Sequence, residues 1–276
     1  MSTLSAGLVQ MTSGPEIGPN LEAAAQGIRE AYEAGARLIV TPENTPILEP
    51  DHARLLAVVP EAERHPALAA FAQMARDLQV WLLLGSTAVK IAEDRLANRS
   101  CLFAPDGSLA ATYDKIHMFD VNVPDGQSYH ESQTFRPGDR AVVAELPAAR
   151  LGLSICYDLR FAALYRALAQ AGAQLLTVPA AFTEFTGQAH WHVLLRARAI
   201  ETGCFVLAPA QGGEHAQGRR TYGHSLVVAP WGEVLAEAEG ATPAVVTVDL
   251  DLAKVDQARS WVPTLTHDRD FAPPDG

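Results

Sequence analysis

The sequence of 276 residues predicts an α/β fold built on mixed β-sheet. Two observations predict it. Short apolar runs typical of buried strands alternate along the chain with alanine-rich segments whose apolar residues have helical spacing. In addition, a Pro-Asp-Gly and a Pro-Trp-Gly turn each join two apolar runs, which indicates antiparallel hairpins beside the parallel strands.

The apolar runs give the predicted strands in order, because buried strands read as short, nearly continuous stretches of Val, Leu and Ile. They cover residues 6–10, 38–41, 80–85, 100–104, 151–155, 175–179, 205–208, 225–229 and 244–248. The two hairpins are predicted around Gly107 and Gly232. We expect one domain over 1–276, with a core at about 4–263 and a C-terminal tail at 264–276.

Helices are predicted between several of these strands. The first covers 20–35, with Asn20 as its N-cap candidate and Gly35 at its end. Further helices are predicted at 66–78, 162–171 and 191–202, where apolar residues recur every three or four positions. The polar stretch 119–140 is predicted to be a long loop, and long loops inside compact domains are often functional.

Composition excludes several function classes. A net charge of −11 and a pI near 5.2 argue against a nucleic-acid partner. No apolar run approaches the about 20 residues that span a bilayer, and residues 1–10 lack the features of a signal peptide, so no membrane association is predicted. The three cysteines, Cys101, Cys156 and Cys204, are too few and too far apart for a disulfide framework and favour a reducing cytoplasm.

Three chemically reactive side chains directly follow predicted strands. Cys156 lies between the run 151–155 and the helix-like segment 162–171, on a turn where backbone N–H groups could stabilise an oxyanion beside the sulfur. Glu43 and Lys115 also follow strands, and ligands gather at the carboxyl ends of strands in α/β sheets. Taken singly, Cys156 could be a core residue, Glu43 a turn residue and Lys115 a solvated charge.

The motifs around these residues decide between the two interpretations. Three segments resemble, in this order, the motifs of the nitrilase (carbon–nitrogen hydrolase) superfamily. They are Pro42-Glu43-Asn44, Tyr113-Asp-Lys115-Ile-His117 and Ser154-Ile-Cys156-Tyr-Asp158-Leu-Arg160-Phe. The resemblance extends from about residue 4 to about residue 263. It implies an α-β-β-α four-layer sandwich that pairs through its helices into an eight-layered homodimer.

The resemblance also implies the role of each group. Cys156 would be the nucleophile, Glu43 the general base and Lys115 the stabiliser of the tetrahedral intermediate. Glu131 matches a second glutamate that the family often uses, and the backbone N–H of Tyr157 would help to hold the oxyanion. A nearby Lys⁺ lowers a thiol pKa and a nearby carboxylate can take its proton. The expected reaction is amide hydrolysis through a thioester, with no metal and no cofactor; His190 and His192 alone are a poor zinc signature.

Further stretches look like the Nit branch, whose small amidases act on ω-amides of dicarboxylates. Within it, the segments 195–201, 208–211 and 219–222 are closer to the amidases of deaminated glutathione, which yield 2-oxoglutarate and Cys-Gly, than to the ω-amidases of 2-oxoglutaramate and 2-oxosuccinamate. The small-molecule substrate would carry carboxylates, so cationic side chains are expected in its pocket. The candidate cations are Arg160, Arg196, Arg219 and Arg220, and the candidate pocket walls are Phe182, Thr183, His190 and Trp191.

Two alternatives stay open at this point. The chain could be an ω-amidase proper, which differs in substrate and not in chemistry. It could also be a catalytically silent dimeric scaffold, although a scaffold has no need to keep Glu43, Lys115 and Cys156 together.

Overall fold

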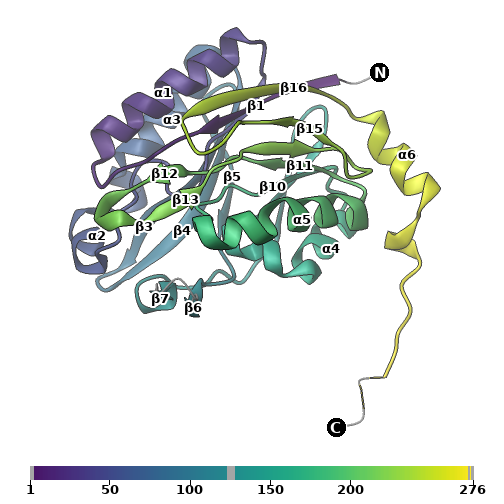
Figure 1. Cartoon of the computed structure of the whole chain (residues 1–276). Coiled ribbons are helices and arrows are strands. Elements are labelled where there is room, and N and C mark those ends of the chain that lie inside the picture. The colour runs from purple at the N-terminus through teal and green to yellow at the C-terminus, as the bar shows by residue number, and fades with distance from the viewer. Residues whose placement is uncertain (1–2, 123–127, 273, 275–276) are drawn as a thin grey trace.

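The computed structural model describes residues 3–122, 128–272 and 274. Its centre is a pair of six-stranded sheets stacked face to face, with helices on both outer sides (Figure 1). The layers are therefore helix, sheet, sheet and helix, and the four-layer α-β-β-α sandwich expected from the resemblance is confirmed.

The first sheet has the strand order β16-β1-β2-β3-β4-β5. Strands β1, β2 and β3 run parallel, whereas β16, β4 and β5 pair antiparallel with their neighbours. The strands are β1 (Thr3–Gln10), β2 (Leu38–Val40), β3 (Trp81–Ala92), β4 (Arg95–Phe103), β5 (Leu109–Asp114) and β16 (Ala244–Asp251).

The second sheet repeats this plan in the order β15-β14-β11-β10-β9-β8. Its centre, β9, β10 and β11, is parallel, and its outer pairs are antiparallel. The predicted hairpins are confirmed as the β4–β5 and β14–β15 pairs, so both sheets are mixed. The strands are β8 (Val142–Glu145), β9 (Arg150–Leu153), β10 (Leu175–Thr177), β11 (Phe205–Ala208), β14 (Leu226–Val228) and β15 (Val234–Glu237).

Helices α1 (Ile17–Glu33) and α3 (Pro66–Leu78) cover the first sheet, and α4 (Ala162–Gln170) and α5 (Glu184–Thr202) cover the second. Helix α3 has its predicted bounds, because Pro66 occupies its first turn and its buried residues Ala67, Phe71 and Ala75 recur every four positions. The side chain of His65 caps it by accepting the N–H of Ala67.

Two helix boundaries differ from the prediction. Asn20 is not an N-cap: α1 begins at Ile17, and the Asn20 amide instead bonds to the backbone of Gly14 and to the carbonyl of Pro46. Helix α5 begins at Glu184 rather than at Trp191. The hydroxyl of Thr183 caps it by accepting the N–H of Thr186, a local signal that lies outside the apolar pattern.

The segment 119–140 is more ordered than the predicted loop. It contains the antiparallel pair β6 (Asp120–Asn122) and β7 (Ser128–His130), followed by the 3₁₀ turn η2 (Glu131–Gln133). Residues 123–127 of this stretch lie outside the described residues. The shorter elements are α2 (His52–Val58), α6 (Ala253–Trp261), β12 (Gly212–Glu214), β13 (Arg220–Tyr222), η1 (Ala62–Arg64), η3 (Cys156–Arg160), η4 (Ala216–Gly218) and η5 (Thr264–Thr266).

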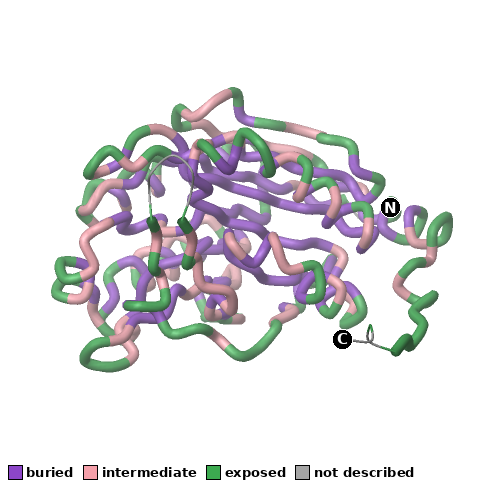
Figure 2. Tube along the Cα trace, turned by 60° about the horizontal axis from the view of Figure 1, so that its bottom comes forward, coloured by how far each residue is buried: buried purple, intermediate pink, exposed green. Residues whose placement is uncertain are grey.

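The main core lies between the two sheets and continues under α4 and α5. Alternation along the strands divides the side chains: Leu38 and Val40 belong to this main core, whereas Ile39 faces the separate core beneath α1 and α3. Figure 2 shows the buried strands running through the middle of the molecule, with exposed residues on the outer faces and along the C-terminal tail. Because the strands are packed between these two cores, the residues that follow their ends are held in defined positions.

Candidate active site

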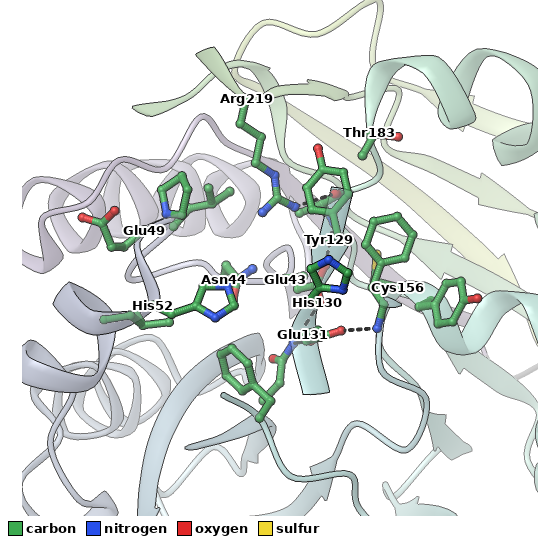
Figure 3. A pocket seen from close by; sticks show the side chains of 18 of the residues that line it. Glu43, Asn44, Glu49, His52, Tyr129, His130, Glu131, Cys156, Thr183 and Arg219 are labelled. Carbon is green, nitrogen blue, oxygen red and sulfur yellow. Dashed lines mark hydrogen bonds between the residues drawn. The ribbon is translucent and has the colours of Figure 1, made fainter. Parts of the chain in front are cut away.

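A cavity of about 580 Å³ lies where strands of both sheets end (Figure 3). Glu43 follows β2 and Lys115 follows β5, both in the first sheet, while Cys156 comes after β9 of the second sheet. Glu131 joins them from the start of η2. The four predicted side chains therefore meet in one cavity of a size typical for small-molecule sites.

Cys156 lies on the sharp turn that the sequence predicts. Its backbone has φ 47°, in the left-handed region that non-glycine residues rarely adopt, and it opens the 3₁₀ turn η3 that leads into α4. Its N–H donates to the carbonyl of Pro179 at 2.9 Å. Residues held in such a conformation cluster at functional sites, where the surrounding structure has to enforce the conformation.

The fully buried carboxylate of Asp158 ties this turn to the segment that carries Lys115. Its Oδ2 accepts from the hydroxyl of Tyr113 at 2.7 Å and from the N–H of Ile155 at 2.9 Å. Its Oδ1 accepts from the backbone N–H of His117 at 3.0 Å and from its Nδ1 at 2.7 Å. The motifs around Lys115 and Cys156 are thus one hydrogen-bonded unit.

Glu43 is buried and held from three directions. Its Oε1 accepts from Lys115 Nζ at 2.9 Å and from Asn98 Nδ2 at 3.0 Å, and its Oε2 accepts from the N–H of Ala181 at 2.9 Å. The backbone before it passes against Gly85, where an added Cβ would lie 1.9 Å from the carbonyl oxygen of Thr41. Only a glycine permits this close approach, which sets the position of the carboxylate.

Lys115 lies between two carboxylates. Besides Glu43, its Nζ donates to both oxygens of Glu131, at 3.0 and 2.9 Å. Glu131 in turn accepts from Asn98 Nδ2 at 3.2 Å and from the N–H of Phe119 at 2.7 Å. This network leaves the ammonium little freedom to move.

The buried charges set the protonation states at neutral pH. Burial raises the pKa of Glu43, but the charge and hydrogen bond of Lys115 outweigh it, so the pKa lies below the usual value. Burial lowers the pKa of Lys115, but the two carboxylates raise it well above the usual value. Burial and the charge of Glu43 raise the pKa of Cys156 well above its usual value despite Lys115.

The thiol is therefore protonated at rest, beside an ionised carboxylate and an ammonium. Lys115 does lower the thiol pKa, as the sequence predicts, but burial and the charge of Glu43 act more strongly in the opposite direction. The arrangement can still generate a thiolate transiently, when Glu43 takes the proton as the sulfur attacks a carbonyl.

The residues predicted as substrate contacts divide into two groups. Phe182 and Thr183 line the cavity, whereas Arg160, His190, Trp191 and Arg196 are not among its lining residues. Tyr157, predicted as the backbone donor to the oxyanion, also lines it. Trp191 is wholly buried in the core, where its indole N–H donates to the carbonyl of His224 at 2.8 Å. Its assignment as a pocket wall is wrong for this reason.

The outlying arginines have other partners. Arg196 is exposed and donates to the carbonyl of Gly232 at 2.7 Å. The guanidinium of Arg160 donates to Nδ1 of the exposed His190 at 3.3 Å and lies over the rings of Tyr157 and Phe182. Arg160 therefore braces the cavity wall from outside.

Arg219 is the predicted cation that reaches the cavity. It lies over the ring of Tyr129, and its Nη2 donates to the carbonyl of Ala181 at 3.2 Å. Its Nε is buried and has no hydrogen-bond partner among the described residues. Its charge also contributes to the lowered pKa of Glu43. Arg220, by contrast, points to solvent and pairs with Glu184 and Glu214.

Asn98 is the main residue that the sequence analysis missed. Its Nδ2 bridges Glu43 and Glu131, while its buried Oδ1 has no partner among the described residues. The sequence offers little signal for it, because in β4 Asn98 is followed directly by the polar residues Arg99 and Ser100. Other lining residues come from α2, the turn before it, and the β6–β7 pair; they include Asn44, Glu49, His52, Phe119, Tyr129 and His130.

The chain is similar to known proteins along nearly its whole length. The sequence pattern of the carbon-nitrogen hydrolase family matches residues 5–260. Deaminated glutathione amidase of Yersinia enterocolitica is 40% identical over 275 residues, 98% of this chain and 94% of that protein. An omega-amidase of Homo sapiens is 36% identical over 271 residues, 98% and 96% of the two chains. One similar solved structure is that of Saccharomyces cerevisiae Nit3, a member of branch 10 of the nitrilase superfamily. It superposes on this chain with a TM-score of 0.87 and is 29% identical in sequence. The match covers 98% of this chain and 97% of Nit3.

Among the described residues, no helix is both long enough and apolar enough to cross a membrane.

Proposed function

This chain belongs to the carbon–nitrogen hydrolase family, and we propose that it is an amidase with Cys156 as nucleophile, Glu43 as general base and Lys115 as oxyanion stabiliser. One observation carries these roles: the Lys115 ammonium bridges the carboxylates of Glu43 and Glu131 in the cavity that also holds the Cys156 thiol. A nucleophile, a base and an electrophilic stabiliser within one enclosed site are what acyl transfer requires.

The first half-reaction forms a thioester. Glu43 takes the thiol proton as Cys156 Sγ bonds to the amide carbon, and the carbonyl oxygen becomes an oxyanion. Lys115 Nζ and the backbone N–H of Tyr157 stabilise that charge. The protonated Glu43 then donates its proton to the amide nitrogen, the C–N bond breaks and the amine leaves.

The second half-reaction hydrolyses the thioester. Glu43, again a carboxylate, takes a proton from water as the water oxygen attacks the acyl carbon. The C–S bond breaks, the acid product leaves, and the proton returns to the sulfur. Glu131 holds the charged Lys115 in place throughout, which we propose as its role because it accepts two hydrogen bonds from Nζ.

We propose deaminated glutathione as the substrate, with 2-oxoglutarate and Cys-Gly as products. The support is the similarity to the deaminated glutathione amidase of Yersinia enterocolitica, which matches along nearly its whole length. The cavity also offers a cation for a substrate carboxylate in Arg219, whose buried Nε has no partner among the described residues. The second candidate is ω-amidase activity on 2-oxoglutaramate or 2-oxosuccinamate, favoured by the similarity to the human omega-amidase.

The test is hydrolysis of each of the three substrates, with Cys156→Ala as the control. The products measured are 2-oxoglutarate and Cys-Gly from deaminated glutathione, 2-oxoglutarate and ammonia from 2-oxoglutaramate, and oxaloacetate and ammonia from 2-oxosuccinamate. A kcat/KM far higher for deaminated glutathione, abolished by the control substitution, supports the first substrate, because specificity is a ratio of kcat/KM values. Turnover of the short ω-amides alone keeps the chemistry and overturns the substrate. Turnover of none of the three contradicts the amidase proposal and favours the silent scaffold.

We also propose that the chain forms one domain, that it pairs into the eight-layered homodimer, and that it resides in the cytoplasm. An apolar surface on α5, α6 and the β14–β15 turn supports pairing, since contiguous apolar patches mark interaction sites. Its residues include Val193, Ile200, Trp231, Trp261 and Val262, each about half exposed or more. All three cysteines are free, which suits a reducing compartment. Light scattering of the purified protein gives the mass that decides for or against the dimer.

A further inference from the structure

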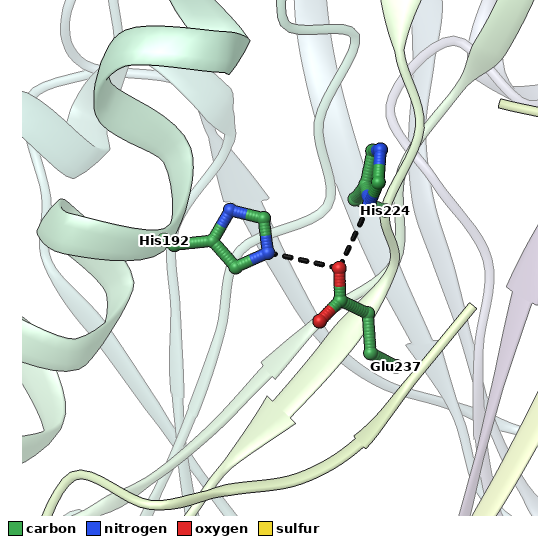
Figure 4. Close-up of side chains that lie close together, drawn as sticks. All are labelled: His192, His224 and Glu237. Carbon is green, nitrogen blue, oxygen red and sulfur yellow. Dashed lines mark hydrogen bonds and ion pairs between the residues drawn. The ribbon is translucent and has the colours of Figure 1, made fainter. Parts of the chain in front are cut away.

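Two histidines and a glutamate meet on the second sheet, apart from the residues that line the active-site cavity (Figure 4). His192 projects from α5, His224 follows β13, and Glu237 ends β15. Oε1 of Glu237 lies 2.9 Å from His192 Nε2 and 2.8 Å from His224 Nδ1. The possible ligand atoms of the three side chains all lie within 4.8 Å of one another.

The surrounding residues fix this arrangement. The ring of Tyr222 stacks on that of His224, with 4.3 Å between the ring centroids, and meets the ring of His192 edge-on, with 6.0 Å between the centroids. The backbone of His224 is anchored twice, because its carbonyl accepts the Trp191 indole N–H and its own N–H donates to Gly240. Its φ of 54° lies in the left-handed region, so the fold holds this imidazole in place against a conformational preference.

We propose that His192, His224 and Glu237 bind a divalent transition-metal ion of the Zn²⁺ class, with water completing its coordination. Two imidazoles and one carboxylate form a ligand set that proteins use for zinc. Tetrahedral ligands at about 2.0–2.2 Å from zinc lie about 3.3–3.5 Å apart. The two observed contacts therefore have to open by about 0.5 Å, and the two imidazole nitrogens, which lie within 4.8 Å of each other, have to reach the same separation. Rotations of these partly exposed side chains can make both adjustments.

The charge at the site suits a cation. Burial raises the pKa of Glu237, but the hydrogen bonds from His192 and His224 outweigh it, so this carboxyl has a pKa below its usual value and is ionised at neutral pH. In the metal-free site the two imidazoles donate protons to Glu237. To bind the ion, each of the two ring nitrogens that face Glu237 offers its lone pair while the ring carries its proton on the other nitrogen, and no oxidation state changes.

The site joins three elements that are far apart in the sequence. A bound ion would link α5 to β15, at the edge of the second sheet, and to His224, which follows β13. Arg219, which lines the cavity, directly precedes β13. The three side chains are each about 30% exposed, with values of 32%, 27% and 32%, so an ion can enter from solvent. The amide hydrolysis proposed above does not use these residues.

The experiment is calorimetric titration of the full-length, tag-free protein with ZnCl₂ after chelator treatment. The protein is titrated unaltered and as Cys156→Ala, which removes the active-site thiol as a competing ligand. One equivalent of Zn²⁺ is expected to bind in both. His192→Ala and Glu237→Gln should each weaken binding by about 100-fold, because loss of an outer partner of a ligand already costs about 10–100-fold.

His190→Ala is the matched control, because it removes an exposed histidine from the same helix and leaves the three ligands intact. Its zinc affinity should equal that of the unaltered protein, and far-UV circular dichroism checks that each variant is folded. The proposal is overturned if the unaltered protein does not bind Zn²⁺ at micromolar concentrations. It is equally overturned if His192→Ala and Glu237→Gln bind as tightly as His190→Ala, since the ion then binds elsewhere.

Discussion

Replacing Asp158 by Asn tests whether the hydrogen bonds between the Lys115 and Cys156 segments hold the site together. The carboxylate accepts four hydrogen bonds, two at each oxygen. An amide keeps one oxygen and turns an NH₂ group toward the donors at the other, so two bonds to a charged group are lost. At about 1.5–3 kcal/mol each, the loss is about 3–6 kcal/mol of folding stability.

For a protein of this size that loss lowers Tm by about 6–24 °C, measured by scanning calorimetry. Turnover should also fall by about 100-fold, because a displacement of about 1 Å between nucleophile and stabiliser is enough for that. Tyr113→Phe removes one of the four donors and should have a smaller effect of the same sign.

Asp270→Asn is the control, since it removes the same charge from an exposed position in the C-terminal tail. Its Tm should change by about 1–2 °C at most, as is usual for surface substitutions. If Asp158→Asn has an equally small effect on Tm and retains full activity, the interlocked motifs do not position the site and our reasoning is wrong.

Four further outcomes are expected. Lys115→Met should lower kcat by a factor of about 10²–10³ with little change in KM, because an oxyanion donor is lost. Lys254→Met is the control: Lys254 is exposed, so the substitution should leave kcat and KM unchanged. Arg219→Gln should instead raise KM for a carboxylate-bearing amide by about 10–100-fold with a smaller effect on kcat; an unchanged KM would remove Arg219 from substrate recognition. Alkylation of Cys156 by iodoacetamide, followed by intact mass, should be slow at neutral pH and become faster as the pH rises above 9. The reason is that the thiol pKa is raised and only the thiolate reacts. A fast reaction at pH 7 would contradict this. Gly85→Ala should abolish folding or activity because its Cβ would lie 1.9 Å from the carbonyl oxygen of Thr41, whereas Gly18→Ala, with nothing within 4 Å, should not lower Tm.

Much of the fold could be predicted because the strands are buried on both faces. A run such as Leu38–Val40 packs on two cores at once and reads as continuous apolar sequence. Boundaries fixed by side-chain hydrogen bonds were harder to predict. Asn20 has the residue type of an N-cap, yet its amide bonds to backbone groups that lie 6 and 26 residues away along the chain. The local sequence does not distinguish an asparagine that caps a helix from one that bonds to distant backbone groups.

The reactive groups of the site could be predicted, but the cavity wall could not. Glu43, Lys115 and Cys156 follow strands, so their positions depend on elements that the sequence reveals. The wall depends on which face of α5 is buried, and that face is obscured because the polar Arg198 is buried on it together with Trp191 and Leu195. Asn98 was missed because its two carboxylate partners come from segments 55 and 33 residues away.

The origin of the site in both sheets has a consequence for biosynthesis. Glu43 and Lys115 are translated before Cys156, yet the thiol meets them only when the second sheet, which includes β11 and β14 from the last third of the chain, has paired and docked. A nascent or half-folded chain therefore holds the Cys156 thiol without the Glu43 carboxylate that we propose as its base. Recovery of turnover during refolding thus reports the docking of the two halves, and the protein cannot hydrolyse an amide before that late event is complete.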